Sequence, residues 1–163
     1  MANPRPPDSK RASAGFVPLL PRVIELAQGV NFAVLTTLMP DGAPQSHVMW
    51  IDSDGEYLLV NTAIGRLKHK NMVKDQRVTV TIWERENPYR FAEVRGRVID
   101  TVPEPEARDH VTVLCLKYQG KAPDPELIAG ERVIMKIAAE RQYTHTAPRP
   151  MPPPSKQMPS VPD

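Results

Sequence analysis

Proline is distributed very unevenly along this chain of 163 residues, which limits what its two ends can fold into. Nineteen residues are proline; five of them lie before residue 22 and seven lie after residue 147. Proline fixes φ and lacks a backbone N–H donor, so dense prolines interrupt helices and sheet ladders. We therefore expect disorder in residues 1–16 and in a Pro-rich tail over 148–163, with one folded domain over 17–147.

Charge and cysteine content narrow the class of protein. Lys and Arg number 21 against 19 for Asp and Glu, a balance that does not favour nucleic acid binding. Only nine residues are aromatic, too few for a nucleic-acid groove in which bases stack on interleaved rings. No apolar run approaches the roughly 20 residues of a membrane span. A single cysteine forms no internal disulfide, so we expect a cytoplasmic protein without a membrane or nucleic acid partner.

Between the Pro-rich ends, periodic apolar residues predict the secondary structure. A first helix is expected over 19–28, with Leu20, Ile24 and Ala27 facing the core and Gly29 ending it. Two later segments, 66–74 and 104–118, also have helical character. The predicted strands are 32–38, 45–51, 57–62, 77–83, 91–101 and 132–146.

The order of these elements favours a mainly β protein with few helices. Asp41-Gly42 and Asp54-Gly55 lie between consecutive strands and are typical of hairpin turns. Gly96 predicts a bend or bulge in the long strand 91–101. Strands and helices do not alternate, and no Gly-rich phosphate loop is present, so a Rossmann-type sheet is not expected. The sequence predicts a six-stranded antiparallel barrel.

The sequence lacks the residue patterns of several common kinds of active site. The histidines and Cys115 do not form the closely spaced ligand sets of a zinc site, so we expect no metal. Cys115 lies between two leucines of the predicted helix 104–118 and is interpreted as a buried apolar residue. No Gly-x-Ser-x-Gly motif indicates a serine hydrolase.

The segment from Asn61 to Lys68 has the residue types of a phosphate-binding site. Asn61 and Thr62 end an apolar strand, and Arg66 and Lys68 follow at the start of a short helix. Strand-end polar groups, helix N-terminal N–H donors and cations together suit an anionic phosphate. The alternative interpretation is a solvated basic helix on the surface of the barrel.

Several motifs between residues 32 and 98 form a recognisable pattern. They are Ala33-Val34-Leu35-Thr36-Thr37, Pro44-Gln45-Ser46-His47-Val48-Met49-Trp50, Leu59-Val60-Asn61-Thr62, Gly65-Arg66-x-Lys68-x-x-Asn71 and Glu93-Val94-Arg95-Gly96-Arg97-Val98. The segment resembles the pyridoxamine-phosphate-oxidase-like split-barrel family of flavin proteins. It is most similar to the branch that uses the 5-deazaflavin coenzyme F420. The resemblance implies a split β-barrel of the FMN-binding type and a homodimer with cofactor sites at its interface.

The resemblance also implies which residues bind the cofactor. Arg66 and Lys68 would hold the cofactor phosphate, and an aromatic residue such as Tyr89 would cross the dimer interface, where ordinary interface packing is the alternative. The cofactor-binding residues expected on this basis are Gln45, Ser46, His47, Val48, Val60, Asn61, Thr62, Arg66, Lys68 and Tyr89. For His47, a core or interface position is the alternative to a cofactor contact. No catalytic residue is assigned.

The function implied is that of an F420-dependent oxidoreductase that transfers a hydride to a small unsaturated organic acceptor. The alternatives are an FMN-binding, pyridoxamine-phosphate-oxidase-like flavoprotein and a non-catalytic flavin-binding protein. The chain lacks the C-terminal basic substrate motif of the pyridoxamine-phosphate oxidases proper, which argues against vitamin B6 chemistry.

Overall fold

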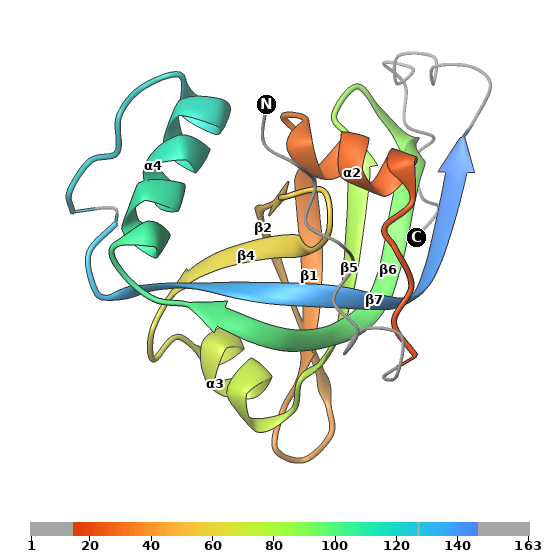
Figure 1. Cartoon of the computed structure of the whole chain (residues 1–163), viewed down its shortest axis with the longest axis horizontal. Coiled ribbons are helices and arrows are strands. Elements are labelled where there is room, and N and C mark those ends of the chain that lie inside the picture. The colour runs from red at the N-terminus through yellow and green to blue at the C-terminus, as the bar shows by residue number, and fades with distance from the viewer. Residues whose placement is uncertain (1–14, 127, 147–163) are drawn as a thin grey trace, which may run out of the picture.

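The computed structural model describes residues 15–126 and 128–146, and within them the chain is mainly β. Seven strands form a single antiparallel sheet in the order β2-β1-β5-β6-β7-β4-β3. The sheet curls into a half-barrel, with the helices placed around its rims (Figure 1). The expected mainly-β split-barrel class is confirmed. The predictions for residues 1–14 and 147–163 lie outside the described residues.

The elements lie close to their predicted positions. The strands are β1 Phe32–Leu38, β2 Pro44–Trp50, β3 Asp52–Ser53, β4 Leu58–Ala63, β5 Arg77–Glu84, β6 Asn87–Val102 and β7 Arg132–Thr146. The helices are α2 Pro21–Gln28, α3 Leu67–Lys74 and α4 Glu106–Gln119. The sheet has seven strands where six were predicted. The additional strand is β3, which pairs with β4 over two residues only. A two-residue strand is too short to show a periodic pattern in the sequence. None of the described helices is long and apolar enough to cross a membrane.

The buried face of α2 differs from the predicted one. Val23, Leu26 and Ala27 are buried, whereas Leu20 is 41% exposed. Leu20 has an extended backbone and precedes the helix as its N-cap, because Pro21 occupies the first helical position. The helix therefore starts two residues later than predicted. Of the three predicted core residues, only Ala27 and the partly buried Ile24 face the core.

The core fills the concave side of the sheet. On β1 and β5 the residues alternate strictly, so that Ala33, Leu35, Val80 and Ile82 are buried while their neighbours face outward. The longest ribbon is formed by β6 and β7, and its register shifts between Arg95 and Gly96. This shift confirms the predicted irregularity at Gly96 and bends the ribbon around the core.

Candidate functional site

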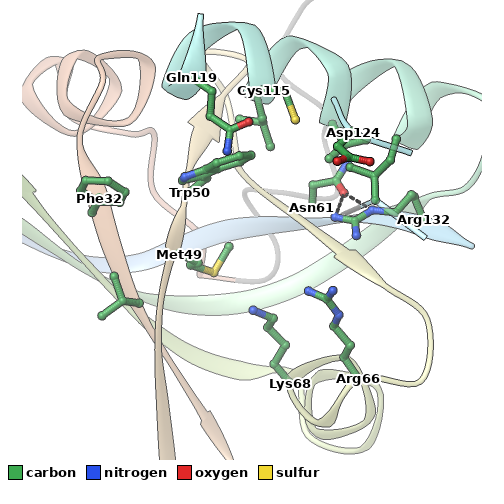
Figure 2. Close-up of a pocket in the computed structure, with 14 residues that line it drawn as sticks. Phe32, Met49, Trp50, Asn61, Arg66, Lys68, Cys115, Gln119, Asp124 and Arg132 are labelled. Carbon is green, nitrogen blue, oxygen red and sulfur yellow. Dashed lines mark hydrogen bonds between the residues drawn. The ribbon is translucent and has the colours of Figure 1, made fainter. Parts of the chain in front are cut away.

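A cavity of about 320 Å³ lies between β2, β4, α3, α4 and the start of β7 (Figure 2). Its volume is within the range of small-molecule pockets. The lining residues are Phe32, Val48, Met49, Trp50, Asn61, Arg66, Lys68, Val111, Leu114, Cys115, Gln119, Asp124, Ile128 and Arg132. They divide the cavity into an apolar, aromatic side and a cationic side.

Trp50 forms the aromatic wall of the cavity. Its ring stacks on Tyr118 of α4, with 5.0 Å between ring centroids and 4° between ring planes. The Tyr118 hydroxyl donates to the Asn31 carbonyl and accepts the Ile51 N–H at 3.1 Å. Burial raises the pKa of Tyr118 to about 12, so the phenol stays neutral. These contacts hold the indole rigidly, as a planar ligand that stacks on it requires.

Arg66 and Lys68 form the cationic side. The strand β4 ends at Ala63, and Gly65, with φ +88°, turns the chain into α3. Both side chains extend from the start of α3 into the cavity (Figure 2). Burial lowers the pKa of Lys68, and the charges of Arg66 and Arg132 lower it further. Within 15–126 and 128–146, no carboxylate pairs with either side chain, which leaves both free for an anionic ligand.

Asn71 fixes the position of α3. It is buried, and its Nδ2 donates to Thr37 Oγ1 of β1 at 3.0 Å. A second contact reaches the Met39 sulfur at 3.5 Å. The Asn71 side chain thus joins the helix to the sheet and holds the start of α3 at the cavity.

Arg132 is a site residue that the sequence analysis did not identify. It is the first residue of β7 and only 6% exposed, and its Nε and Nη2 donate to Asn61 Oδ1 at 2.9 and 2.6 Å. Burial lowers its pKa, and the nearby charges of Arg66 and Arg108 add to this effect. The sequence signal for this residue was an arginine at the start of an apolar strand. Arginine is rarely buried without a partner, so an arginine in such a strand indicates a buried interaction.

The predicted site residues fall into two groups. Val48, Asn61, Arg66 and Lys68 line the cavity together. Gln45 and His47 of β2 are not among the lining residues; they contact each other, with 3.0 Å between the Gln45 amide nitrogen and His47 Nδ1. Burial lowers the pKa of His47, and so does the charge of Lys68.

The other predicted site residues do not line the cavity. Val60 and Thr62 of β4 are fully buried, and the Thr62 hydroxyl has no hydrogen-bond partner among the described residues. Ser46 is exposed on β2 and its hydroxyl lies 2.8 Å from Thr36 Oγ1. Tyr89, near the start of β6, is 53% exposed. The cofactor roles of all ten residues remain predictions.

The remaining polar groups of the cavity do not form a metal site. Cys115 is buried in the wall, as predicted, and burial raises the pKa of its thiol. Asp124, the one carboxylate among the lining residues, accepts the Glu126 N–H at 3.0 Å. In the described part of the chain, no three His, Cys, Asp or Glu side chains gather closely enough to hold a metal ion.

Together these features define a split-barrel protein whose cavity has an aromatic wall and a cationic side. The Trp50 indole lines it together with three cations, none of which forms an ion pair with a carboxylate within the described residues. The family model for pyridoxamine 5'-phosphate oxidase matches residues 19–146. The chain belongs to this family, which binds the flavin FMN.

Solved structures agree with this assignment. A protein described as an F420 reductase is 32% identical, covering 73% of this chain and 94% of its own, with a TM-score of 0.65. The conserved hypothetical protein Rv2991 from Mycobacterium tuberculosis is 23% identical over 81% of this chain and 87% of its own, with a TM-score of 0.61. A putative pyridoxamine 5'-phosphate oxidase from Listeria innocua is 22% identical over 75% and 91%, with a TM-score of 0.53. Among curated proteins, none matches the chain significantly.

Proposed function

We propose that this protein is an oxidoreductase that binds coenzyme F420 in the cavity and transfers a hydride to a small unsaturated organic acceptor. The observation that carries the proposal is the cluster of Arg66, Lys68 and Arg132, which form no ion pair among the described residues, opposite the Trp50 wall. The 32% identity to a protein described as an F420 reductase supports the choice of oxidoreductase.

The residues of the cavity fit both parts of such a cofactor. Arg66 and Lys68 would bind a phosphate group, with Arg132 contributing a third positive charge. Trp50 and Met49 would contact the ring, and the apolar residues of α4 would keep water away from it. When bound, the deazaflavin supplies the hydride chemistry. The protein then provides binding, orientation and exclusion of water.

The preference for F420 over FMN rests on charge beyond the cavity. F420 carries a phosphodiester and an anionic glutamate tail, whereas FMN ends in one compact phosphate. Lys70 and Lys74 are exposed on α3, on the same short helix as Lys68. Within the described residues neither lysine forms an ion pair, so both charges are available to a longer anionic ligand.

Titration with both cofactors tests this proposal. In a Trp83→Phe variant, Trp50 is the only remaining tryptophan and reports on the cavity directly. We expect F420 to quench Trp50 fluorescence and to bind at least about tenfold more tightly than FMN, a difference of about 1.4 kcal/mol. Tighter binding of FMN would establish the flavoprotein alternative instead. Binding of neither would show that the cavity is not a cofactor site.

Turnover separates an enzyme from a non-catalytic flavin-binding protein. Reduced F420 is mixed with the protein and a panel of small unsaturated acceptors, and cofactor oxidation is followed by absorbance. Substrate-dependent oxidation supports the oxidoreductase. Tight binding without oxidation across a broad panel favours the non-catalytic alternative.

We also propose that the protein is a homodimer that associates through the convex face of the sheet. Residues that pair directly across neighbouring strands share one face of an antiparallel sheet. One such row runs Val48, Val34, Thr81, Glu93 and Tyr143 across five strands. Val48 and Tyr143 are 66% and 52% exposed, and Val48 also lines the cavity. This convex row therefore connects an exposed apolar surface to the candidate site.

The assembly is predicted to be a dimer at micromolar concentration. Light scattering should give twice the chain mass of 18.2 kDa. Tyr143→Arg places a charge on each side of a two-fold interface, so we expect it to shift the mass toward that of the monomer. A monomer mass for the unmodified chain would contradict the proposal.

A further inference from the structure

A chain of polar side chains leads from the cavity into the protein behind it. Arg132 donates to Asn61 Oδ1, and Asn61 Nδ2 lies 3.3 Å from Nδ1 of His110. On its other side, His110 Nε2 lies 3.3 Å from Oδ2 of Asp52. The four residues come from β7, β4, α4 and β3, and only Asn61 and Arg132 line the cavity. The proposed function gives no role to Asp52 and His110.

The hydrogen bonds of Asn61 determine its orientation. Its Nδ2 donates to the Ala107 carbonyl at 2.7 Å and faces His110 Nδ1, while its Oδ1 accepts both bonds from Arg132. Rotating the amide by half a turn would place its NH₂ group against the guanidinium, where both partners are donors. The observed orientation is the one that satisfies every partner. It requires His110 Nδ1 to accept a hydrogen bond, so the ring proton lies on Nε2.

Asp52 fixes this form of the histidine from the other side. Burial opposes its ionisation, but hydrogen bonds from His110 and the Ser53 N–H, together with the charge of Lys117, outweigh burial and lower the pKa of Asp52. Lys117 Nζ is itself held by the Ala27 and Ile51 carbonyls at 2.6 and 2.9 Å. The Asp52 carboxylate therefore stays ionised and accepts the Nε2–H of His110.

We propose that Asp52 and His110 are positioning residues that orient Arg132 through Asn61, and that protonation of His110 weakens anion binding in the cavity. This inference rests on the proposed function of the cavity as an anion-binding site. A histidine is the side chain whose charge ordinarily changes between about pH 5 and pH 8. Among the charged groups near His110, Asp52 of β3 faces its Nε2, Lys117 contacts the same carboxylate, and Arg132 lies on the far side of Asn61.

The sign of the effect follows from the donors involved. A protonated His110 carries N–H groups on both nitrogens, so Nδ1–H faces the N–H of Asn61 and their hydrogen bond is lost. If Asn61 rotates to relieve this contact, its NH₂ group faces Arg132, which then loses its acceptor. In the first case Asn61 loses one of the contacts that orient it toward Arg132, and in the second case Arg132 loses its acceptor directly. If protonation of His110 acted only through its added positive charge, it would strengthen anion binding in the cavity. A weakening of anion binding on acidification therefore indicates a positioning role instead.

Sulfate titrations at two pH values test the inference. Sulfate keeps its charge between pH 5.5 and pH 8, and the Nε–H signal of Arg132 in ¹⁵N NMR spectra reports directly on the guanidinium. An Arg132→Lys spectrum assigns that signal, and chloride keeps the ionic strength constant. We expect sulfate affinity in the unmodified protein to fall about fivefold on acidification relative to His110→Gln, the factor for one ordinary hydrogen bond. His145→Gln removes an exposed histidine of β7 and should follow the unmodified protein.

Asp52→Asn provides a second test that does not depend on the folding of His110→Gln. Asp52→Asn removes the carboxylate that accepts the His110 Nε2–H, so it should alter the pH profile of sulfate affinity. Coinciding pH profiles for the unmodified protein and His110→Gln, or stronger binding at low pH that requires His110, would overturn the inference. An unmoved profile in Asp52→Asn would also overturn it. Absence of sulfate binding at every pH would instead overturn the proposed anion site itself.

Discussion

Replacing Gly96 with alanine is expected to lower the free energy of unfolding by about 3 kcal/mol or more, a large part of the roughly 5–15 kcal/mol that stabilises a typical domain. A Cβ atom at Gly96 would lie 2.0 Å from the carbonyl oxygen of Ala138 and 3.2 Å from the Cα of Ala139. Both neighbours are backbone atoms of β7, which cannot move without disturbing the longest strand pair of the sheet. Urea unfolding followed by circular dichroism measures the loss.

Gly42→Ala is the matched control for Gly96→Ala. Gly42 has φ +86° but no atom within 4 Å of an added Cβ, so it tests backbone strain without a clash. Its expected cost is about 1 kcal/mol. Equal losses for the two variants would show that the β6–β7 pair adjusts readily to a side chain, contrary to the rigid bulge seen here.

Most of the fold was predictable because its determinants are local. Alternating apolar residues and Asp-Gly turns are read within a few neighbouring positions, and the bounds of β1 and β7 were predicted exactly. The failures also have local causes. Pro21 makes α2 begin two residues later than predicted, and β3 owes its place to pairing with Leu58 and Leu59 rather than to any pattern of its own.

The candidate site was predictable only where its residues are close in sequence. Asn61, Arg66 and Lys68 come from one strand-to-helix connection, and the structure places all three at the cavity. Arg132 is 71 residues from Asn61, the partner that holds it. Long-range packing brings these two side chains together, and no short sequence motif indicates their contact. The same reason explains why Asp52 and His110, 58 residues apart, were not recognised as a pair.

Lys68→Ala is expected to weaken F420 binding by about 1.5–3 kcal/mol, roughly tenfold to a hundredfold, the range for a hydrogen bond to a charged group. The ammonium lies in the cavity beside Arg66 and Arg132, with no carboxylate partner in the described part of the chain. An anion bound there replaces this repulsion with attraction. Fluorescence titration of the Trp83→Phe protein with and without Lys68→Ala measures the change. Added salt should weaken F420 binding further, because part of the cation cluster is exposed to solvent.

Stability distinguishes a ligand-binding lysine from a structural one. Burial and neighbouring cations lower the pKa of Lys68, so its charged form costs the folded protein stability at neutral pH. Lys68→Ala should therefore leave the free energy of unfolding unchanged or raise it while affinity falls. Arg85→Ala, at an exposed cation of the turn between β5 and β6, is the control and should change neither quantity. A loss of stability with unchanged affinity would place Lys68 in the structural framework and leave the cation cluster without a ligand to bind.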